Sequence, residues 1–98
     1  MLEKLEGLAD RYDELENQLA SPNLYDDPER AAALTKEHRN LQPILKTYRA
    51  YQTACQDEQD AKELLEEAGG DADMHALAQE TLASSREQKE QLEQELKI

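Results

Sequence analysis

Besides its numerous, scattered carboxylates, this 98-residue sequence offers two histidines and one cysteine for acid–base, nucleophilic or metal-ligand chemistry: His38, His75 and Cys55. Catalysis requires several such groups to converge in one pocket. The two histidines fall on different expected helices, and neither belongs to a metal-ligand spacing such as H-E-x-x-H. Cys55 continues a heptad series of apolar residues, which favours a packed core thiol over a nucleophile. We therefore expect no enzyme activity, no bound metal and no cofactor.

The basic residues are more informative, because they gather in one window of an acidic chain. The whole sequence has 23 acidic and 11 basic residues, a formal net charge of −12. Between residues 30 and 55, however, there are five basic residues and a single acid, Glu37. On a helix, four of the basic side chains fall within an arc of about 140°; we call these the positive strip: Lys36, Arg39, Lys46 and Arg49.

Two interpretations of the positive strip stay open. Its charge either offsets the acidic neighbouring helices or forms a docking surface for RNA or an acidic protein. The strongly acidic total opposes nonspecific nucleic-acid binding by the rest of the chain.

Composition sets the class of element that must carry these residues. The sequence has no Trp, Phe or Val, and only 3 Gly and 3 Pro, which argues against a sheet protein. Its apolar runs are too short to cross a membrane, and its single cysteine cannot form an internal disulfide, so we expect a cytoplasmic protein with no membrane contact. The fold class that fits is all-α: a three-helix antiparallel bundle or helical hairpin, coiled-coil-like, with one long central helix.

Helix boundaries follow from local chemistry. Pro22 stops the first helix, while Asp27 can cap the second and Pro28 fits its first position. Gly69 and Gly70 end the second helix, and Asp71 or Asp73 can cap the third. We predict helices at about 2–20, 28–68 and 73–97, with Pro43 placing a kink, and no break, in the second.

Apolar spacing predicts how these helices pair. In an antiparallel pair of helices, the numbers of two residues that face each other add up to a constant. Folding the first helix onto the second gives a sum of about 48, and folding the third onto the second gives a sum of about 141. The second helix carries two heptad series, Leu34, Leu41, Tyr48, Cys55 and Ile44, Tyr51, Leu65. The third helix is expected to bury Met74, Leu77, Ala78, Leu82, Leu92 and Leu96. Both helices are polar in the middle of their seam, which predicts a weakly packed region there.

The end of the chain bears on domain organisation. We expect residues 1–98 to form a single helical domain cut from a longer multidomain protein, because Leu34 and Leu41 would need third-helix partners beyond Ile98. Uncovered apolar residues there would drive weak self-association of the fragment.

Several of these residues together resemble a known family. The segment from Leu34 to Glu37, followed by Leu41, Pro43-Ile44, Tyr48 and Tyr51, is similar to the N-terminal domain of bacterial class I peptide chain release factors. The restart at Asp27-Pro28-Glu29 and the later helix with Met74, Leu77 and Ala78 are similar too. The likeness covers essentially the whole chain and is closer to the type 1 than to the type 2 factors.

The resemblance implies a translation-termination factor. Type 1 factors read UAA and UAG, and their codon-reading tripeptide and Gly-Gly-Gln motif lie in later domains. The first domain is a helical arm that approaches the GTPase-associated region of the large ribosomal subunit and is linked to the class II factor. On this view the positive strip contacts the ribosome or another partner. The alternatives are an arm of a type 2 or related ribosome-rescue factor, and an unrelated coiled-coil interaction scaffold.

Overall fold

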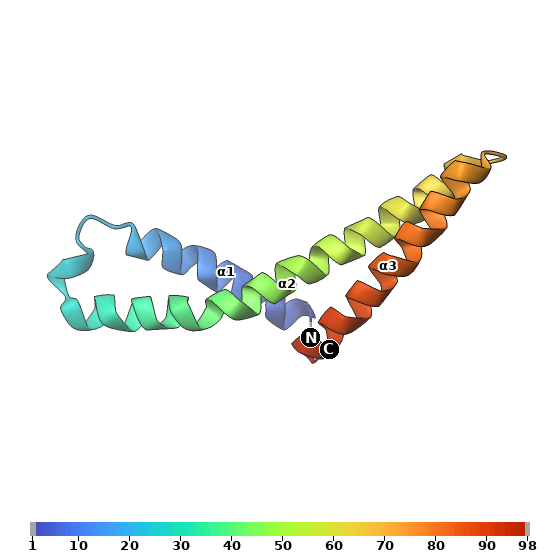
Figure 1. Ribbon diagram of the computed structural model, residues 1–98. Coiled ribbons are helices and arrows are strands. Elements are labelled where there is room, and N and C mark those ends of the chain that lie inside the picture. The colour runs from blue at the N-terminus through green and yellow to red at the C-terminus, as the bar shows by residue number, and fades with distance from the viewer. Residues whose placement is uncertain (1, 98) are drawn as a thin grey trace. The chain divides into compact units, whose positions relative to one another are not determined.

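The computed structural model describes residues 2–97, which form three long helices and one short one. Figure 1 shows their arrangement along the chain. Helix α1 spans Leu2–Leu19, the 3-10 helix η1 spans Leu24–Asp26, α2 spans Pro28–Ala68 and α3 spans Ala72–Leu96. No strand occurs among the described residues, so the predicted all-α class with one long central helix is confirmed. The chain divides into two compact units, the first ending at Lys46 and the second beginning at Thr47.

The helix ends have the local chemistry that the sequence predicts. The Asp27 side chain accepts a hydrogen bond from the backbone N–H of Arg30 at 3.1 Å, which caps α2. Asp71 does the same for Met74 at the start of α3, also at 3.1 Å. Between α2 and α3, Gly69 has a φ of +54°, a conformation that a side chain would strain. Helix α2 runs through Pro43 without a break, as predicted.

In the first unit, α1 packs against the first part of α2. Leu15 is fully buried, as is Leu45, and each contributes about 2 kcal/mol by leaving water. Arg11 on α1 pairs with Glu37 on α2, and their numbers total 48, so the predicted pairing of these helices is confirmed.

The same packing corrects one expectation. Leu34 and Leu41 are only 8% and 9% exposed, so they are covered within the described residues and need no extension of the third helix. The predicted pairing already places Leu34 opposite Leu15 and Leu41 opposite Leu8 on the first helix, so only the additional cover expected from the third helix is wrong.

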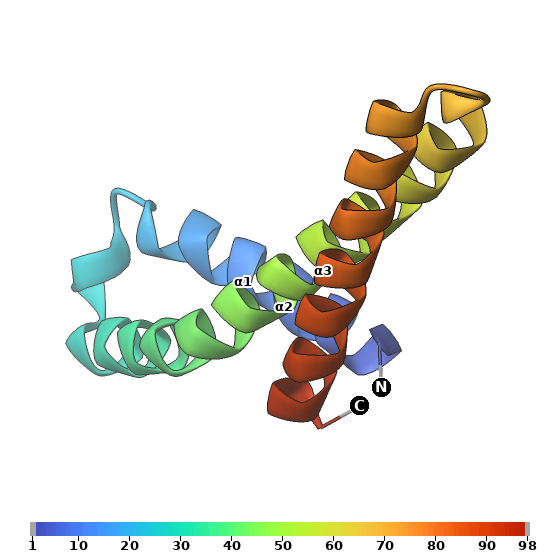
Figure 2. The same ribbon diagram turned by 45° about the vertical axis from the view of Figure 1, so that its right-hand side comes forward.

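In the second unit, α3 lies beside the later part of α2 in both views (Figures 1 and 2). The Tyr51 hydroxyl donates to Glu93 at 3.3 Å, and Glu58 lies 3.5 Å from Arg86. The residue numbers of each pair add up to 144, three more than the predicted total of about 141, so the register is shifted by one to two residues on each helix. Small side chains fill the seam, and all are at most 5% exposed; we call them the small-residue seam: Ala54, Ala61, Ala68, Ala78 and Ser85.

Three apolar predictions on α2 and α3 are wrong, and several others, Cys55 among them, are only half met. Met74 and Leu77 are 38% and 57% exposed, because Ala78 takes the buried position on that turn of α3. Ile44 is 39% exposed and lies outside the buried face of α2. Cys55 is half-buried, whereas Ala54 beside it is fully packed.

Candidate functional site

His38 on α2 is part of the packing of the first unit. Its ring stacks on Tyr12 with centroids 4.3 Å apart and planes 17° apart. The Nε2 atom of His38 lies 3.4 Å from a carboxylate oxygen of Glu16, and the side chain is 20% exposed. An imidazole held in this way positions α1 on α2 and faces no second catalytic group.

The remaining chemistry-bearing groups lie in the second unit and are also separate. His75 is exposed on the first turn of α3, and its backbone N–H donates to the Asp71 carbonyl at 2.9 Å. The half-buried thiol of Cys55 lies near Tyr51; burial first, and then a hydrogen bond with this thiol, raises the pKa of Tyr51 to about 12. Within residues 2–97 no group of three or more His, Cys, Asp or Glu could hold a metal ion.

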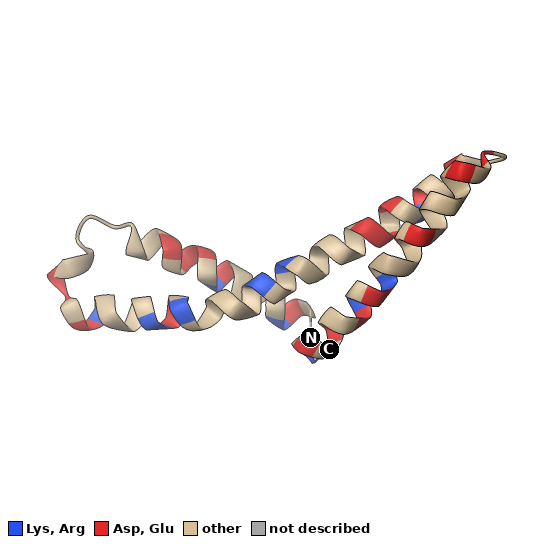
Figure 3. Cartoon of the chain, in the orientation of Figure 1, with Lys and Arg blue, Asp and Glu red and all other residues tan. Residues whose placement is uncertain are grey.

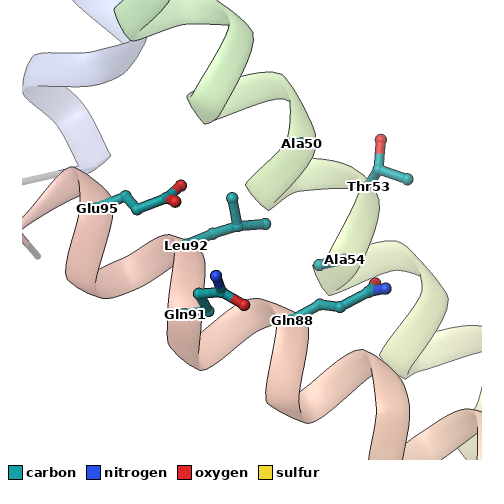
Figure 4. Close-up of a pocket in the computed structure, with 7 residues that line it drawn as sticks. All are labelled: Ala50, Thr53, Ala54, Gln88, Gln91, Leu92 and Glu95. Atoms are coloured by element: carbon teal, nitrogen blue, oxygen red, sulfur yellow. The ribbon is translucent and has the colours of Figure 1, made fainter.

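A groove of about 430 Å³ crosses the second unit between α2 and α3 (Figure 4). Its α2 side is made of the small residues Ala50, Thr53 and Ala54, and its α3 side carries Leu92 and Glu95 with two glutamines. The carboxylate of Glu95 is its only ionisable lining group. An acid without a nucleophile or a base partner gives no catalytic arrangement.

The positive strip lies on the exposed side of α2. Lys36, Arg39 and Lys46, all in the first unit, have exposed side chains. No carboxylate of residues 2–97 forms an ion pair with any of these three. Arg49 belongs to the second unit, is exposed too, and already interacts with another group of the chain. The three cations of the first unit are therefore the available part of the strip.

The acid nearest to these cations in sequence is engaged elsewhere. Glu37 accepts two hydrogen bonds from the guanidinium of Arg11, the shorter at 2.6 Å. These hydrogen bonds hold the pKa of Glu37 below its usual value, and Glu37 raises the pKa of Arg11 in return. The single acid of the basic window is thus paired with a cation of α1, which leaves the charges of Lys36, Arg39 and Lys46 to face solvent.

A second charged cluster, which sequence reasoning missed, is centred on Glu58 in the second unit. Its carboxylate lies 3.5 Å from each of Lys62, Arg86 and Lys89, and its side chain is 14% exposed. Desolvation favours the protonated acid, but the charges of Lys89 and Lys62 outweigh it and lower the pKa of Glu58. In the sequence Glu58 interrupts an apolar series, which is the signal that a polar group enters the seam.

No helix within residues 2–97 has both the length and the apolar character needed to cross a bilayer. The charge pattern differs between the units: Figure 3 shows basic segments along the early part of α2 and acidic segments about the α2–α3 turn. The described residues therefore present exposed charged surfaces of different sign on the two units.

Comparison with known proteins identifies the family of the chain. The family model of the PCRF domain matches residues 8–98. Peptide chain release factor 1 of Agathobacter rectalis is 42% identical over 98 residues, which is all of this chain and 27% of that protein. The proteins of the same name from Streptococcus uberis and Streptococcus gordonii are 38% and 36% identical over 96 residues, 98% of this chain and again 27% of each relative. No solved structure matches the chain. The chain spans about a quarter of the length of these relatives. Because the family model matches nearly all of the chain, the chain belongs to the PCRF domain family.

Proposed function

We propose that this chain is the N-terminal helical arm of a bacterial type 1 peptide chain release factor. The match to the PCRF domain and the shared name of the relatives, Peptide chain release factor 1, support this assignment over an arm of a type 2 factor. On this proposal the whole factor works in the cytoplasm and releases the finished peptide at UAA and UAG. The arm contributes binding to the ribosome and takes no part in the hydrolysis.

The observation that carries the binding role is the set of three unpaired cations on α2. These cations, Lys36, Arg39 and Lys46, lie within eleven consecutive residues, or about 15 Å of helix. A cation that has no carboxylate partner loses no internal ion pair when it meets a phosphate. The ribosomal partner we propose is RNA in the GTPase-associated region of the large subunit. Charges on an exposed helix face act chiefly on the rate of encounter, and their effect extends over a Debye length of about 10 Å at 0.1 M salt.

The test reverses two of these charges in the full-length factor. We expect Arg39→Glu together with Lys46→Glu to slow association with ribosomes stalled at a stop codon about tenfold at low salt. Peptide release at saturating factor should stay unchanged. Stopped-flow fluorescence across a salt series measures the first quantity, and single-turnover release measures the second.

A matched control distinguishes docking from general charge. Lys4 on α1 is also exposed and has no described ion pair, so Lys4→Glu changes the net charge as much as Arg39→Glu does. Docking through the strip predicts that the single variant Arg39→Glu slows association and Lys4→Glu does not. Equal slowing by the two variants would show that association depends on general charge, and it would contradict docking through the strip. A lower melting temperature of Arg39→Glu with normal association at every salt concentration would show that the strip only balances the acidic helices.

A further inference from the structure

Two large apolar side chains are exposed at the start of α3. Leu77 is 57% exposed and Met74 is 38% exposed. They are three residues apart and therefore lie on the same face of the helix. One exposed apolar side chain is ordinary, but two neighbours on one face provide a contact area for another molecule.

A groove of about 350 Å³ adjoins Leu77 in the second unit. Asp57 on α2 and Glu80 on α3 line it together with Leu77, Thr81 and two serines. Neither Asp57 nor Glu80 forms an ion pair within residues 2–97. The groove thus joins one apolar wall to two unpaired carboxylates, which is the combination that a Lys or Arg side chain fits: an apolar stem and a charged head.

The surroundings decide the charge of the partner. Residues 63–85 contain six acidic residues and no Lys or Arg. The next cations along α3, Arg86 and Lys89, are already within 3.5 Å of Glu58. Acidic segments accordingly gather about the α2–α3 turn in Figure 3. A phosphate backbone would be repelled here, whereas a basic protein segment is attracted.

We propose that this surface, the Leu77 face (Asp57, Met74, Leu77 and Glu80), docks a basic amphipathic segment of a partner protein. A Lys or Arg of the partner enters the groove between Asp57 and Glu80, and an apolar side chain of the partner packs on Met74 and Leu77. The chain then carries two surfaces of opposite preference: the positive strip takes phosphate, and the Leu77 face takes a basic protein. This assignment does not depend on the release-factor proposal, because it rests on the groove and its charges alone.

The experiment titrates the isotope-labelled 98-residue chain with a short amphipathic helical peptide of leucine and lysine, and follows amide chemical shifts by NMR. We expect shifts at residues 74–85 and at Asp57, and none along residues 36–46. Glu80→Lys should weaken peptide binding about tenfold and Leu77→Ser about fivefold. Both side chains are exposed, so circular dichroism should show an unchanged fold.

The control variant is Asp10→Lys, which makes the same charge change at an exposed acid of α1. Equal weakening by Asp10→Lys and Glu80→Lys would overturn the proposal, since the attraction would then be general. Binding of a single-stranded RNA oligonucleotide to the same amides would overturn the choice of a protein partner. If these amide shifts depend on the concentration of the chain in the absence of peptide, the surface binds a second copy of this chain, and the proposal of a basic partner protein is overturned.

Discussion

Arg11 on α1 donates two parallel hydrogen bonds to the carboxylate of Glu37 on α2, from Nε to Oε2 at 2.6 Å and from Nη2 to Oε1 at 2.8 Å. The planar fork of arginine matches a carboxylate in this geometry, and lysine cannot reproduce it. The pair fixes the register of α1 on α2, and it occupies the one acid of the basic window. A single contact thus stabilises the first unit and leaves the positive strip unpaired.

The pH dependence of stability should report this pair. The hydrogen bonds from Arg11 hold the pKa of Glu37 below its ordinary value of about 4.5. The stabilisation from this pair is therefore fully present above about pH 4.5 and is lost as the pH falls through the lowered pKa. We expect the thermal midpoint of Glu37→Gln to be lower than that of the native chain at pH 7 and the two to converge in acid. Glu6→Gln, an exposed acid of α1, is the control and should follow the native curve throughout. A constant offset between Glu37→Gln and the native chain at every pH would contradict this.

A large-to-small substitution in the core of the first unit should strongly destabilise the chain. Leu15 is fully buried, so Leu15→Ala removes buried methyl groups and leaves a cavity, at a cost of about 3 kcal/mol. Leu77→Ala makes the same chemical change at a side chain that is 57% exposed, and it should cost less than about 0.5 kcal/mol. Urea unfolding followed by circular dichroism measures both. Similar costs at the two positions would mean that Leu77 is covered in solution.

The small-residue seam should reject larger side chains. Ala78 has no exposed surface, so Ala78→Leu forces α2 and α3 apart and should destabilise the chain by about 2 kcal/mol. Ala76 is exposed two residues away on the same helix, and Ala76→Leu should be nearly neutral. Thermal unfolding distinguishes the two variants, and a neutral Ala78→Leu would show that the seam has room to spare.

The cluster at Glu58 should be sensitive to loss of its central charge. Glu58→Gln leaves Lys89, Lys62 and Arg86 repelling one another around a neutral amide, so the variant should melt at a lower temperature at pH 7. Added salt should narrow the difference because it screens the three cations. Glu66→Gln, an exposed acid on α2, is the control and should melt with the native chain. If the difference in melting temperature between Glu58→Gln and the native chain persists in high salt, the loss of stability comes from packing and not from repulsion among the three cations.

The predictable part of this fold is the part set by neighbours in sequence. Pro28 and Asp27 define the start of α2, and Gly69 defines its end, through backbone conformation and capping that act within one turn. The pairing of α1 with α2 was also predictable, because leucines on both helices mark the shared face. The candidate strip was found from charge spacing alone.

The features that could not be predicted depend on which residues of one helix contact which residues of another. The burial of Ala78 was predicted, but the α2 side of the small-residue seam was not, because alanine gives a weak apolar signal, although Ala54, Ala61 and Ala68 recur every seven residues. Leu77 was wrongly added to the same buried face, because leucine gives a strong apolar signal. The Arg11–Glu37 pair joins residues 26 apart, and no local pattern indicates which of the many acids this arginine selects.

The small-residue seam also sets how the second unit moves. Alanine and serine side chains place little apolar area between α2 and α3, so separating the helices near Gly69 exposes little and costs much less than unfolding the chain. We expect the turn-proximal part of the hairpin to open and reclose as a local event. Amide hydrogens of residues 61–78 should then exchange with solvent through that opening, whereas those around Leu15 should exchange only on global unfolding.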